Sequence, residues 1–343
     1  MQHKHAPRPL PLFLELVRTV GETDPALAAN ALAGLSKYEI APRLSAYPER
    51  PVAHRHGPAT LADCGGSGPP VVLVPSLINP PQILDLDGDV SLARAIAAEG
   101  RHTLLLDWGP APDRSELDLS GHVEKLLLPL IAELEEAPAL VGYCLGGTMA
   151  IAAANMARVE RVVTLASPWR FSNYPSESRA AVERLWENAR PSAERLRLLP
   201  MEVLQGAFWS LDARQTVAKF AAFDDIDLSS DKARRFVTLE DWANEGEPLP
   251  FAAARELVED LFGECLPERG QWTGCGRSLG DRLDCPLLNV TAGHDRIAPV
   301  ATVSSEGTTV EIAAGHVGMV VGSKRGLLHE LLNDFLAGRA PRR

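Results

Sequence analysis

The sequence predicts an α/β fold, in which helices flank a mainly parallel sheet and a helical cap is inserted into the core. Short apolar runs alternate with helical segments after about residue 50, a pattern typical of a parallel sheet that is covered on both faces. The alternation stops between residues 169 and 280, where helical segments follow one another without a buried strand, and it returns after residue 280.

These observations divide the chain into three predicted parts. Residues 1–50 are expected to form a helical N-terminal extension, residues 51–168 and 281–343 the α/β core, and residues 169–280 the cap. The cap segment holds most of the tryptophans of the chain, which we interpret as its own apolar core. They are Trp169, Trp186, Trp209, Trp242 and Trp272.

The predicted strands are short apolar runs that end at turn residues. Near the start of the core, residues 51–55 and 59–62 are expected to pair as an antiparallel hairpin at the edge of the sheet. The buried parallel strands are predicted at residues 71–75 (VVLVP), 102–107 (HTLLLD), 139–143 (ALVGY), 161–166 (RVVTLA), 286–291 (PLLNVT) and 308–312 (TTVEI).

The predicted helices have helical apolar spacing and recognisable ends. Residues 91–99 form one of them, with Ser91 as the N-cap. Residues 119–136 form another, and Pro129 is expected to kink it, because proline cannot donate the internal hydrogen bond. Two more core helices are predicted. One begins at Gly146 (GGTMAIAAANMA), and the other spans residues 324–336.

Composition and charge limit the classes of protein to be considered. The chain is 45% hydrophobic and 23% charged, as is usual for a soluble globular protein. Its net charge of −11 and the lack of a basic stripe argue against a nucleic-acid partner. The N-terminal apolar stretch is broken by Pro9 and Pro11 and does not resemble a signal peptide. No run approaches the ~20 apolar residues of a membrane span, so we expect a cytoplasmic protein.

The cysteines do not form a disulfide or zinc pattern. An odd number of scattered cysteines is no disulfide framework, and thiols stay reduced in the cytoplasm. Their spacing is too wide for zinc knuckles, and no histidine pair lies nearby. We therefore expect neither a metal nor a cofactor, and we interpret four of the five cysteines as free or buried structural thiols. These are Cys64, Cys265, Cys275 and Cys285.

The fifth cysteine lies in a motif that indicates covalent catalysis. The spacing Gly142-x-Cys144-x-Gly146 matches a nucleophile elbow with cysteine in place of serine. Such an elbow has strained backbone angles, and small neighbours let the chain turn without clashes. It follows a predicted strand and precedes an alanine-rich helix, whose N-terminal N–H groups favour a thiolate. This context predicts an α/β-hydrolase fold with Cys144 as nucleophile.

A cysteine nucleophile requires a base and a group that orients the base. In this fold the acid precedes the histidine along the chain. Asp295 follows the strand PLLNVT in the loop GHDRIAP, and His316 lies in AAGHVGM, between the last strand and the last helix. We therefore predict a Cys144–His316–Asp295 triad. His294 and His329 also follow the nucleophile, but the first neighbours the acid and the second lies in a predicted helix.

Two backbone N–H groups are expected to stabilise the oxyanion of the reaction. Leu145, directly after the nucleophile, supplies the first. The second should come from the loop SLINPP after the first buried strand, at Ile78 or Asn79. Asn79 has the alternative interpretation of a turn residue before Pro80.

The same segments resemble the poly(3-hydroxyalkanoate) synthases. GYCLGGT is similar to their modified lipase box, PSLINPPQILDL and LLLDWG to their first strand and loop and second strand, and GHDRIAP and AGHVGM to their acid and histidine loops. WANEGEPLPFAAARELVEDLF resembles a segment of their cap. The resemblance covers roughly residues 70–335 and departs from the family pattern at residues 246–248 and 267–276. The chain lacks the long N-terminal domain of the larger synthases and resembles the short catalytic subunit.

The resemblance implies an acyltransferase that polymerises (R)-3-hydroxyacyl-CoA. His316 would deprotonate Cys144, the thiolate would take the acyl group, and Asp295 would orient His316 or help to activate the attacking 3-hydroxyl. CoA would be the product, with the CoA thioester as substrate rather than cofactor. The family also implies a growing polyester as partner, an accessory synthase subunit, a homodimer and association with the surface of polymer granules.

Three other interpretations compete with this one. A cysteine hydrolase of the same fold, either an acyl-CoA thioesterase or an intracellular polyhydroxyalkanoate depolymerase, would use the same triad and transfer the acyl group to water. A non-catalytic granule-associated or regulatory subunit would not require all three triad residues. A serine esterase would need another nucleophile, but Ser76 and Ser167 lack elbow glycines.

Overall fold

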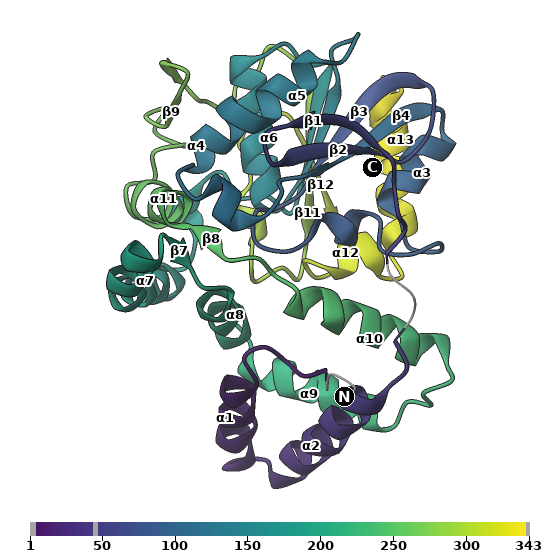
Figure 1. Ribbon diagram of the computed structural model, residues 1–343, viewed down its shortest axis with the longest axis vertical. Helices are drawn as coiled ribbons and strands as arrows, with labels where there is room; N and C mark the ends of the chain where they lie inside the picture. The colour runs from purple at the N-terminus through teal and green to yellow at the C-terminus, as the bar shows by residue number, and fades with distance from the viewer. Residues whose placement is uncertain (1–4, 44–46, 341–343) are drawn as a thin grey trace. The chain divides into compact units, whose positions relative to one another are not determined.

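The computed structural model describes residues 5–43 and 47–340 and divides into two compact units. The first combines the described residues of Met1–Ala46 with Pro200–Gly246. The second combines Tyr47–Leu199 with the described residues of Glu247–Arg343 and contains the large sheet (Figure 1).

The eight strands of the large sheet run in the order β1-β2-β4-β3-β5-β6-β11-β12. The first three neighbouring strands pair antiparallel and all later pairs are parallel. This arrangement confirms the α/β-hydrolase fold and the antiparallel edge hairpin predicted above. The strands are β1 (Val52–His56), β2 (Ala59–Asp63), β3 (Gly68–Val74), β4 (Arg101–Asp107), β5 (Ala139–Tyr143), β6 (Arg161–Leu165), β11 (Leu287–Ala292) and β12 (Thr308–Ile312).

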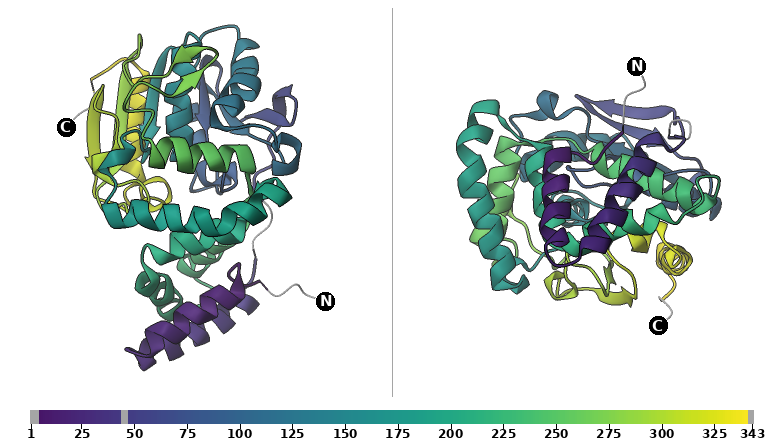
Figure 2. Two further views of the ribbon diagram at one scale, coloured as in Figure 1. Left: turned by 90° about the vertical axis from the view of Figure 1, so that its left-hand side faces the viewer. Right: turned by 90° about the horizontal axis from the view of Figure 1, so that it is seen from below.

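Helices cover both faces of this sheet. Helices α3 and α13 lie together on one face, with α3 against β4, and helix α6 lies on the other against β5 and β6 (Figures 1 and 2). The central strands carry apolar side chains on both faces, and β3, β5, β6 and β11 are almost wholly buried. The helices of the core are α3 (Leu92–Ala98), α4 (Leu119–His122), α5 (Leu128–Ala132), α6 (Leu145–Met156), α12 (Gly318–Val321) and α13 (Arg325–Leu336).

Two of the predicted helix features have a clear local cause. Ser91 is the N-cap of α3, and its side chain accepts from the N–H of Arg94 at 2.9 Å, as predicted. The segment predicted as one kinked helix is α4 and α5, joined by a π-helical turn at Val123–Leu127. Pro129 follows that turn and has no N–H to donate back along the helix, so the hydrogen-bond pattern changes there.

The remaining elements of the second unit connect the core strands or lie in the segment predicted as the cap. They include two pairs of two-residue strands, which are too short to be recognised from apolar periodicity. These elements are α7 (Ser176–Leu196), β7 (Leu198–Leu199), β8 (Leu249–Pro250), α11 (Phe251–Arg255), β9 (Thr273–Gly274), β10 (Arg277–Ser278), the π-helix η5 (Glu256–Gly263) and the 3-10 turns η1 (Pro81–Leu84), η2 (Ala111–Arg114), η4 (Phe171–Asn173) and η6 (Val300–Thr302).

The first unit is a helical cluster made from two distant stretches of sequence. In Figure 1 its purple helices α1 and α2 lie beside the teal and green helices α8, α9 and α10. Phe13 is buried and contacts Trp209 and Phe220, and Tyr38 donates a hydrogen bond to Asp241 at 2.5 Å. Its helices are α1 (Leu10–Gly21), α2 (Pro25–Ile40), α8 (Met201–Ser210), α9 (Ala213–Asp224) and α10 (Asp231–Asn244).

This division differs from the one predicted from the sequence. The predicted cap, residues 169–280, is shared between the two units, and its middle part packs with the predicted N-terminal extension. Its tryptophans therefore do not form one core. Trp209 packs in the first unit against Phe13, whereas Trp169 and Trp272 contact each other in the second, with ring centroids 5.9 Å apart.

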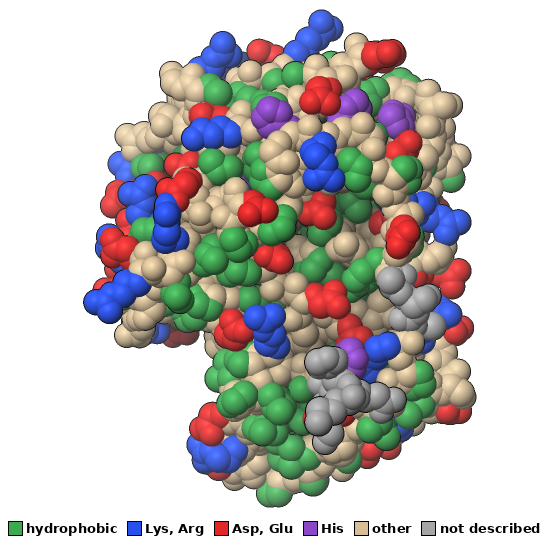
Figure 3. All heavy atoms as spheres, in the orientation of Figure 1, with side chains coloured by type: hydrophobic (Ala, Val, Ile, Leu, Met, Phe, Trp, Pro, Cys, Tyr) green, Lys and Arg blue, Asp and Glu red, His purple; other side chains and the backbone are tan. Residues whose placement is uncertain are grey.

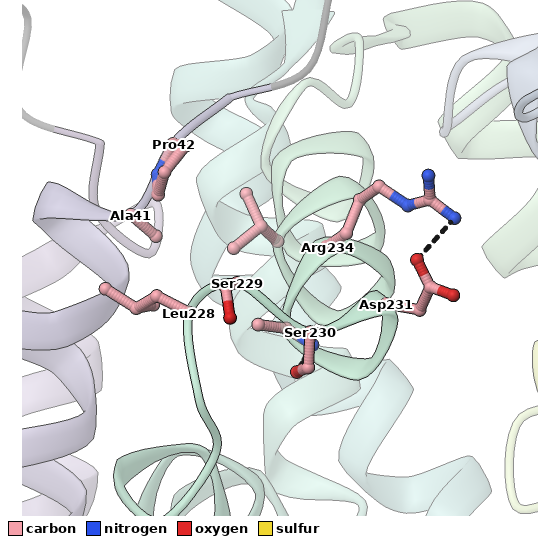
Figure 4. Close-up of a pocket in the computed structure, with 9 residues that line it drawn as sticks. Ala41, Pro42, Leu228, Ser229, Ser230, Asp231 and Arg234 are labelled. Carbon is pink, nitrogen blue, oxygen red and sulfur yellow. Dashed lines mark hydrogen bonds and ion pairs between the residues drawn. The ribbon is translucent and has the colours of Figure 1, made fainter.

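A pocket of about 210 Å³ lies in the first unit, between the end of α2 and the start of α10 (Figure 4). Asp231 and Arg234 form an ion pair of 3.0 Å at its rim. None of the residues that the sequence predicts for catalysis lines it, so the chemistry has to be sought in the second unit. On the face of the molecule in Figure 3, acidic and basic side chains are interspersed rather than gathered into a basic stripe.

Candidate active site

The nucleophile elbow joins β5 to α6. Cys144 is the residue between them. Its backbone angles, φ 56° and ψ −129°, are ones that residues other than glycine rarely adopt. Holding it costs about 1–3 kcal/mol, and such strain collects at functional sites. The Cys144 N–H donates to Leu165 O at 2.9 Å, and the residue is partly exposed. The elbow therefore presents a strained, accessible thiol at the start of a helix.

Three glycines make this elbow possible. A Cβ on Gly142 would lie 2.6 Å from the Gly147 nitrogen, and one on Gly147 would lie 2.6 Å from Ser167 Cβ. A Cβ on Gly146 would overlap the Val74 carbonyl oxygen and lie 2.6 Å from that of Pro75, at the end of β3. Each glycine therefore permits a different close approach, and the one at Gly146 brings the helix start against the neighbouring strand.

Asp295 and His316 meet in the loops that follow β11 and β12. His316 Nδ1 lies 2.6 Å from Asp295 Oδ2, and both side chains are buried. The other carboxylate oxygen of Asp295 accepts from the N–H groups of Ile297 and Ala298, at 2.8 and 2.9 Å. The carboxylate is thus held by its own loop while it accepts from the imidazole. In this arrangement Nδ1 carries a proton and donates it to Asp295, and Nε2 is available to accept a proton from the nucleophile.

Tyr143, the residue before the nucleophile, supports the imidazole from the side. Its ring centroid lies 5.1 Å from that of His316, and its hydroxyl lies 3.5 Å from the backbone oxygen of His316. Burial raises the pKa of the Tyr143 phenol, which therefore stays neutral. The residue was not predicted as part of the site, although its position next to the nucleophile places it there.

The electrostatics of the site favour a charged imidazole. Burial alone lowers the pKa of His316, but the negative charges of Cys144 and Asp295 and hydrogen bonds to both outweigh it. Together they raise that pKa to about 10, from an ordinary value of 6.5. A histidine with such a pKa accepts a proton readily, so His316 is suited to act as the base for the nucleophile.

The structure places the predicted oxyanion residues on two neighbouring elements. Leu145 is the first residue of α6, directly after Cys144. Ile78 and Asn79 lie in the loop after β3, which pairs with β5. The Ile78 N–H already donates to Ser76 Oγ at 3.3 Å. It would have to leave that partner to serve an oxyanion, and Asn79 remains the alternative.

The two other candidate histidines lie elsewhere. His294 is exposed, and its N–H donates to Ala314 O at 2.9 Å. His329 lies in α13 and is half-buried, and burial lowers its pKa. Neither approaches the acid in the way His316 does, so the geometry favours the histidine chosen from the sequence.

The described part of the chain contains no group of three or more His, Cys, Asp or Glu side chains arranged to hold a metal ion. All five cysteines are unpaired. Among residues 5–43 and 47–340, no helix is both long and apolar enough to cross a bilayer.

The solved structures to which the chain is similar include a lipase and an esterase. The monoacylglycerol lipase of Paleococcus ferrophilus is 15% identical, with a TM-score of 0.48 over 82% of this chain and 99% of that one. An esterase from Exiguobacterium antarcticum is 13% identical, with a TM-score of 0.46 over 81% of this chain and 95% of that one.

No family model matches the chain, but individual proteins do. The poly(3-hydroxyalkanoate) polymerase subunit PhaC of Haloferax mediterranei is 25% identical over 79% of this chain and 59% of its own length, so the chain spans less than two thirds of that relative. The subunits of the same name from Allochromatium vinosum and Thiocystis violacea are 24% and 25% identical, each over 74% of this chain and 76% of its own length. The resemblance predicted from the motifs is thereby confirmed: the chain is similar in sequence to poly(3-hydroxyalkanoate) polymerase subunits over about three quarters of its length.

Proposed function

We propose that this chain is an acyltransferase that polymerises (R)-3-hydroxyacyl-CoA through a thioester on Cys144 and releases CoA. The observation that carries the proposal is the juxtaposition of the strained Cys144 elbow with the buried Asp295–His316 pair. The similarity to polymerase subunits supports the substrate class.

In the first half-reaction, His316 Nε2 takes the proton of the Cys144 thiol. The thiolate then attacks the carbonyl carbon of the acyl-CoA, and the carbonyl oxygen carries the negative charge of the tetrahedral intermediate. The N–H of Leu145 and one N–H of the loop after β3 would stabilise that oxygen. When the intermediate collapses, the CoA sulfur leaves with the proton from His316, and the acyl group stays on Cys144.

In the second half-reaction, a 3-hydroxyl group attacks the Cys144 thioester. His316 accepts the hydroxyl proton and returns a proton to the Cys144 sulfur, so an ester forms and the free thiol is regenerated. Asp295 holds the imidazole in the required tautomer throughout. A thioester intermediate keeps the free energy of the CoA thioester, and so transfer to a hydroxyl remains downhill. A serine ester would have lost most of that driving force.

The proposal includes the partners that the family resemblance implies. These are the acyl-CoA substrate, the growing polyester, an accessory synthase subunit, a second copy of the chain and the surface of a polymer granule. No cofactor is required, because the CoA thioester itself supplies the acyl group and the driving force.

The test is incubation of the purified protein with 3-hydroxybutyryl-CoA and with longer-chain homologues, following thiol release and product together. CoA release with insoluble polyester is the expected result, and Cys144→Ala should abolish it. CoA release with only free 3-hydroxy acid would replace the proposal by a thioesterase. Unchanged rates in Cys144→Ala would contradict the mechanism.

Asp295→Asn and His316→Gln should each lower the rate of CoA release by orders of magnitude, because the three residues act as a unit. His329→Gln is the matched control, since it removes a half-buried histidine of the same unit that lies in α13. An equal loss in His329→Gln would show that the wrong histidine had been chosen.

A further inference from the structure

The loop after β3 is held at two points by parts of the chain outside it. At its start, the Pro75 carbonyl accepts from the Trp108 indole N–H at 3.1 Å. In its middle, the Ile78 carbonyl accepts from the Glu247 N–H at 2.8 Å. Ser76 Oγ and the Ile78 N–H close the loop on itself. These three hydrogen bonds limit the movement of the loop.

The Pro75 carbonyl also lies against the nucleophile elbow. The space beside Gly146 is so narrow that a Cβ there would come within 2.6 Å of the Pro75 oxygen. The same carbonyl therefore lies between the first turn of α6 and the Trp108 indole. Trp108 is therefore hydrogen-bonded to an atom at which the two elements with the proposed oxyanion donors approach each other.

Trp108 is itself fixed by a buried polar pair. It is 3% exposed, and the His122 ring meets it edge-on with centroids 5.8 Å apart. His122 Nδ1 lies 2.6 Å from Asp118 O, and its Nε2 accepts from Arg114 at 3.1 Å. Burial lowers the pKa of His122 to about 3, so the ring is neutral and its tautomer is set by these two partners. Arg114 also donates to Gly109 O, one residue after Trp108, at 3.0 Å.

We propose that Trp108 is a positioning residue of the proposed acyl transfer: its indole N–H fixes the Pro75 carbonyl, and with it the loop that supplies the second oxyanion donor. The His122 ring packs against the indole, and Arg114 holds that ring and the backbone next to Trp108. The inference rests on the proposed function, because an oxyanion forms only if Cys144 attacks a carbonyl group.

Two reactions of Cys144 separate this role from a general structural one. Acylation by 3-hydroxybutyryl-CoA passes through an oxyanion and needs the loop in place. Alkylation by iodoacetamide displaces iodide from a saturated carbon, so it needs the Cys144 thiolate but no oxyanion donor. A residue that positions only the oxyanion loop should affect the first rate and leave the second unchanged.

The experiment compares wild type with Trp108→Phe, which keeps an aromatic ring and removes the N–H. Both rates are measured at Cys144, with mass spectrometry to identify the modified cysteine among the five. We expect acylation to fall about tenfold to 100-fold, less than the ~10²–10³-fold loss of an outright oxyanion donor. Alkylation should stay within about twofold of wild type, a difference that corresponds to about 0.4 kcal/mol in the activation free energy.

Trp186→Phe is the matched control. It also removes a buried indole N–H, which donates to Glu259 Oε1 at 2.8 Å, but from a helix that makes no hydrogen bond to the loop in the described structure. Acylation in this variant should match wild type. Replacement of Trp108 by 3-benzothienylalanine, which exchanges N–H for sulfur at nearly constant shape, repeats the test should Trp108→Phe fail to fold.

The outcomes are distinct. Wild-type acylation in both Trp108 variants would overturn the inference and leave the proposed function intact. Equal losses of acylation and alkylation in both would also overturn it, since they would indicate a general disturbance of the elbow. Wild-type protein that is alkylated but never acylated by any 3-hydroxyacyl-CoA would instead overturn the proposed function.

Discussion

Gly146 is the position at which one added methyl group should test the elbow most directly. In Gly146→Ala the new Cβ would overlap the Val74 carbonyl oxygen and lie 2.6 Å from that of Pro75, whereas ordinary contacts begin at 3.4 Å. Both neighbours are backbone atoms at the end of β3, so no flexible side chain can swing away. The helix start and the strand end must separate instead.

The expected cost has a stability part and a catalytic part. Overpacking of this kind typically costs about 1–3 kcal/mol, and a clash with backbone should bring it to the upper end. The separation also moves Leu145 away from the loop after β3. A misplacement of about 1 Å can lower a rate about 10²-fold, so acylation of Cys144 should fall by that order in protein that is still folded.

The measurements are urea unfolding and the rate of CoA release from 3-hydroxybutyryl-CoA. Gly280→Ala is the control, because its Cβ would meet nothing within 4 Å and its φ is not positive. It should match wild type in both measurements. A Gly146→Ala protein with wild-type stability and wild-type acylation would refute the elbow geometry described here.

Three further predictions concern the site and the first unit. Cys144→Ser should release CoA far more slowly than wild type, because a serine hydroxyl is not ionised by His316; comparable turnover in the two proteins would contradict the thiolate mechanism. Because the pKa of His316 is raised to about 10, its protonation should contribute stability that is complete below pH 6.5 and lost as the pH rises towards 10. Urea unfolding should show this loss of stability in wild type and not in His316→Gln. The same dependence of stability on pH in the two proteins would contradict the prediction. Gly34→Ala should destabilise the first unit by about 1–3 kcal/mol, since its Cβ would lie 2.8 Å from the backbone carbonyl carbon of Phe220; an unchanged urea midpoint would exclude the close packing of α2 on α9.

Local pattern was sufficient for most of the α/β core. The strands after residue 100 were predicted within one residue of their observed limits, and Ser91 was predicted as a helix cap. Buried parallel strands are continuous apolar runs, and caps are fixed by residues a few positions away. The elbow glycines and the loops that hold Asp295 and His316 also stand at strand ends that can be located in the sequence, because the carboxyl ends of parallel strands share one edge.

Other features depended on contacts between distant segments. The sequence does not indicate that residues near Phe13 pack with helices beginning beyond residue 200, because helical periodicity marks an apolar face and does not name the segment that will cover it. The hydrogen bond from Trp108 to the Pro75 carbonyl likewise cannot be predicted from the sequence, because its acceptor is a backbone oxygen and every residue has one.

The sequence by itself therefore determined the fold class, the elbow and the identity of the residues proposed for catalysis, all of which depend on local backbone and strand-end position. Only the tertiary structure decided the division into two units, the partner of the Ile78 N–H and the fixing of the oxyanion loop by Trp108. These depend on which surfaces meet when the chain is closely packed, and packing is set by the shape of all neighbours together rather than by any one segment.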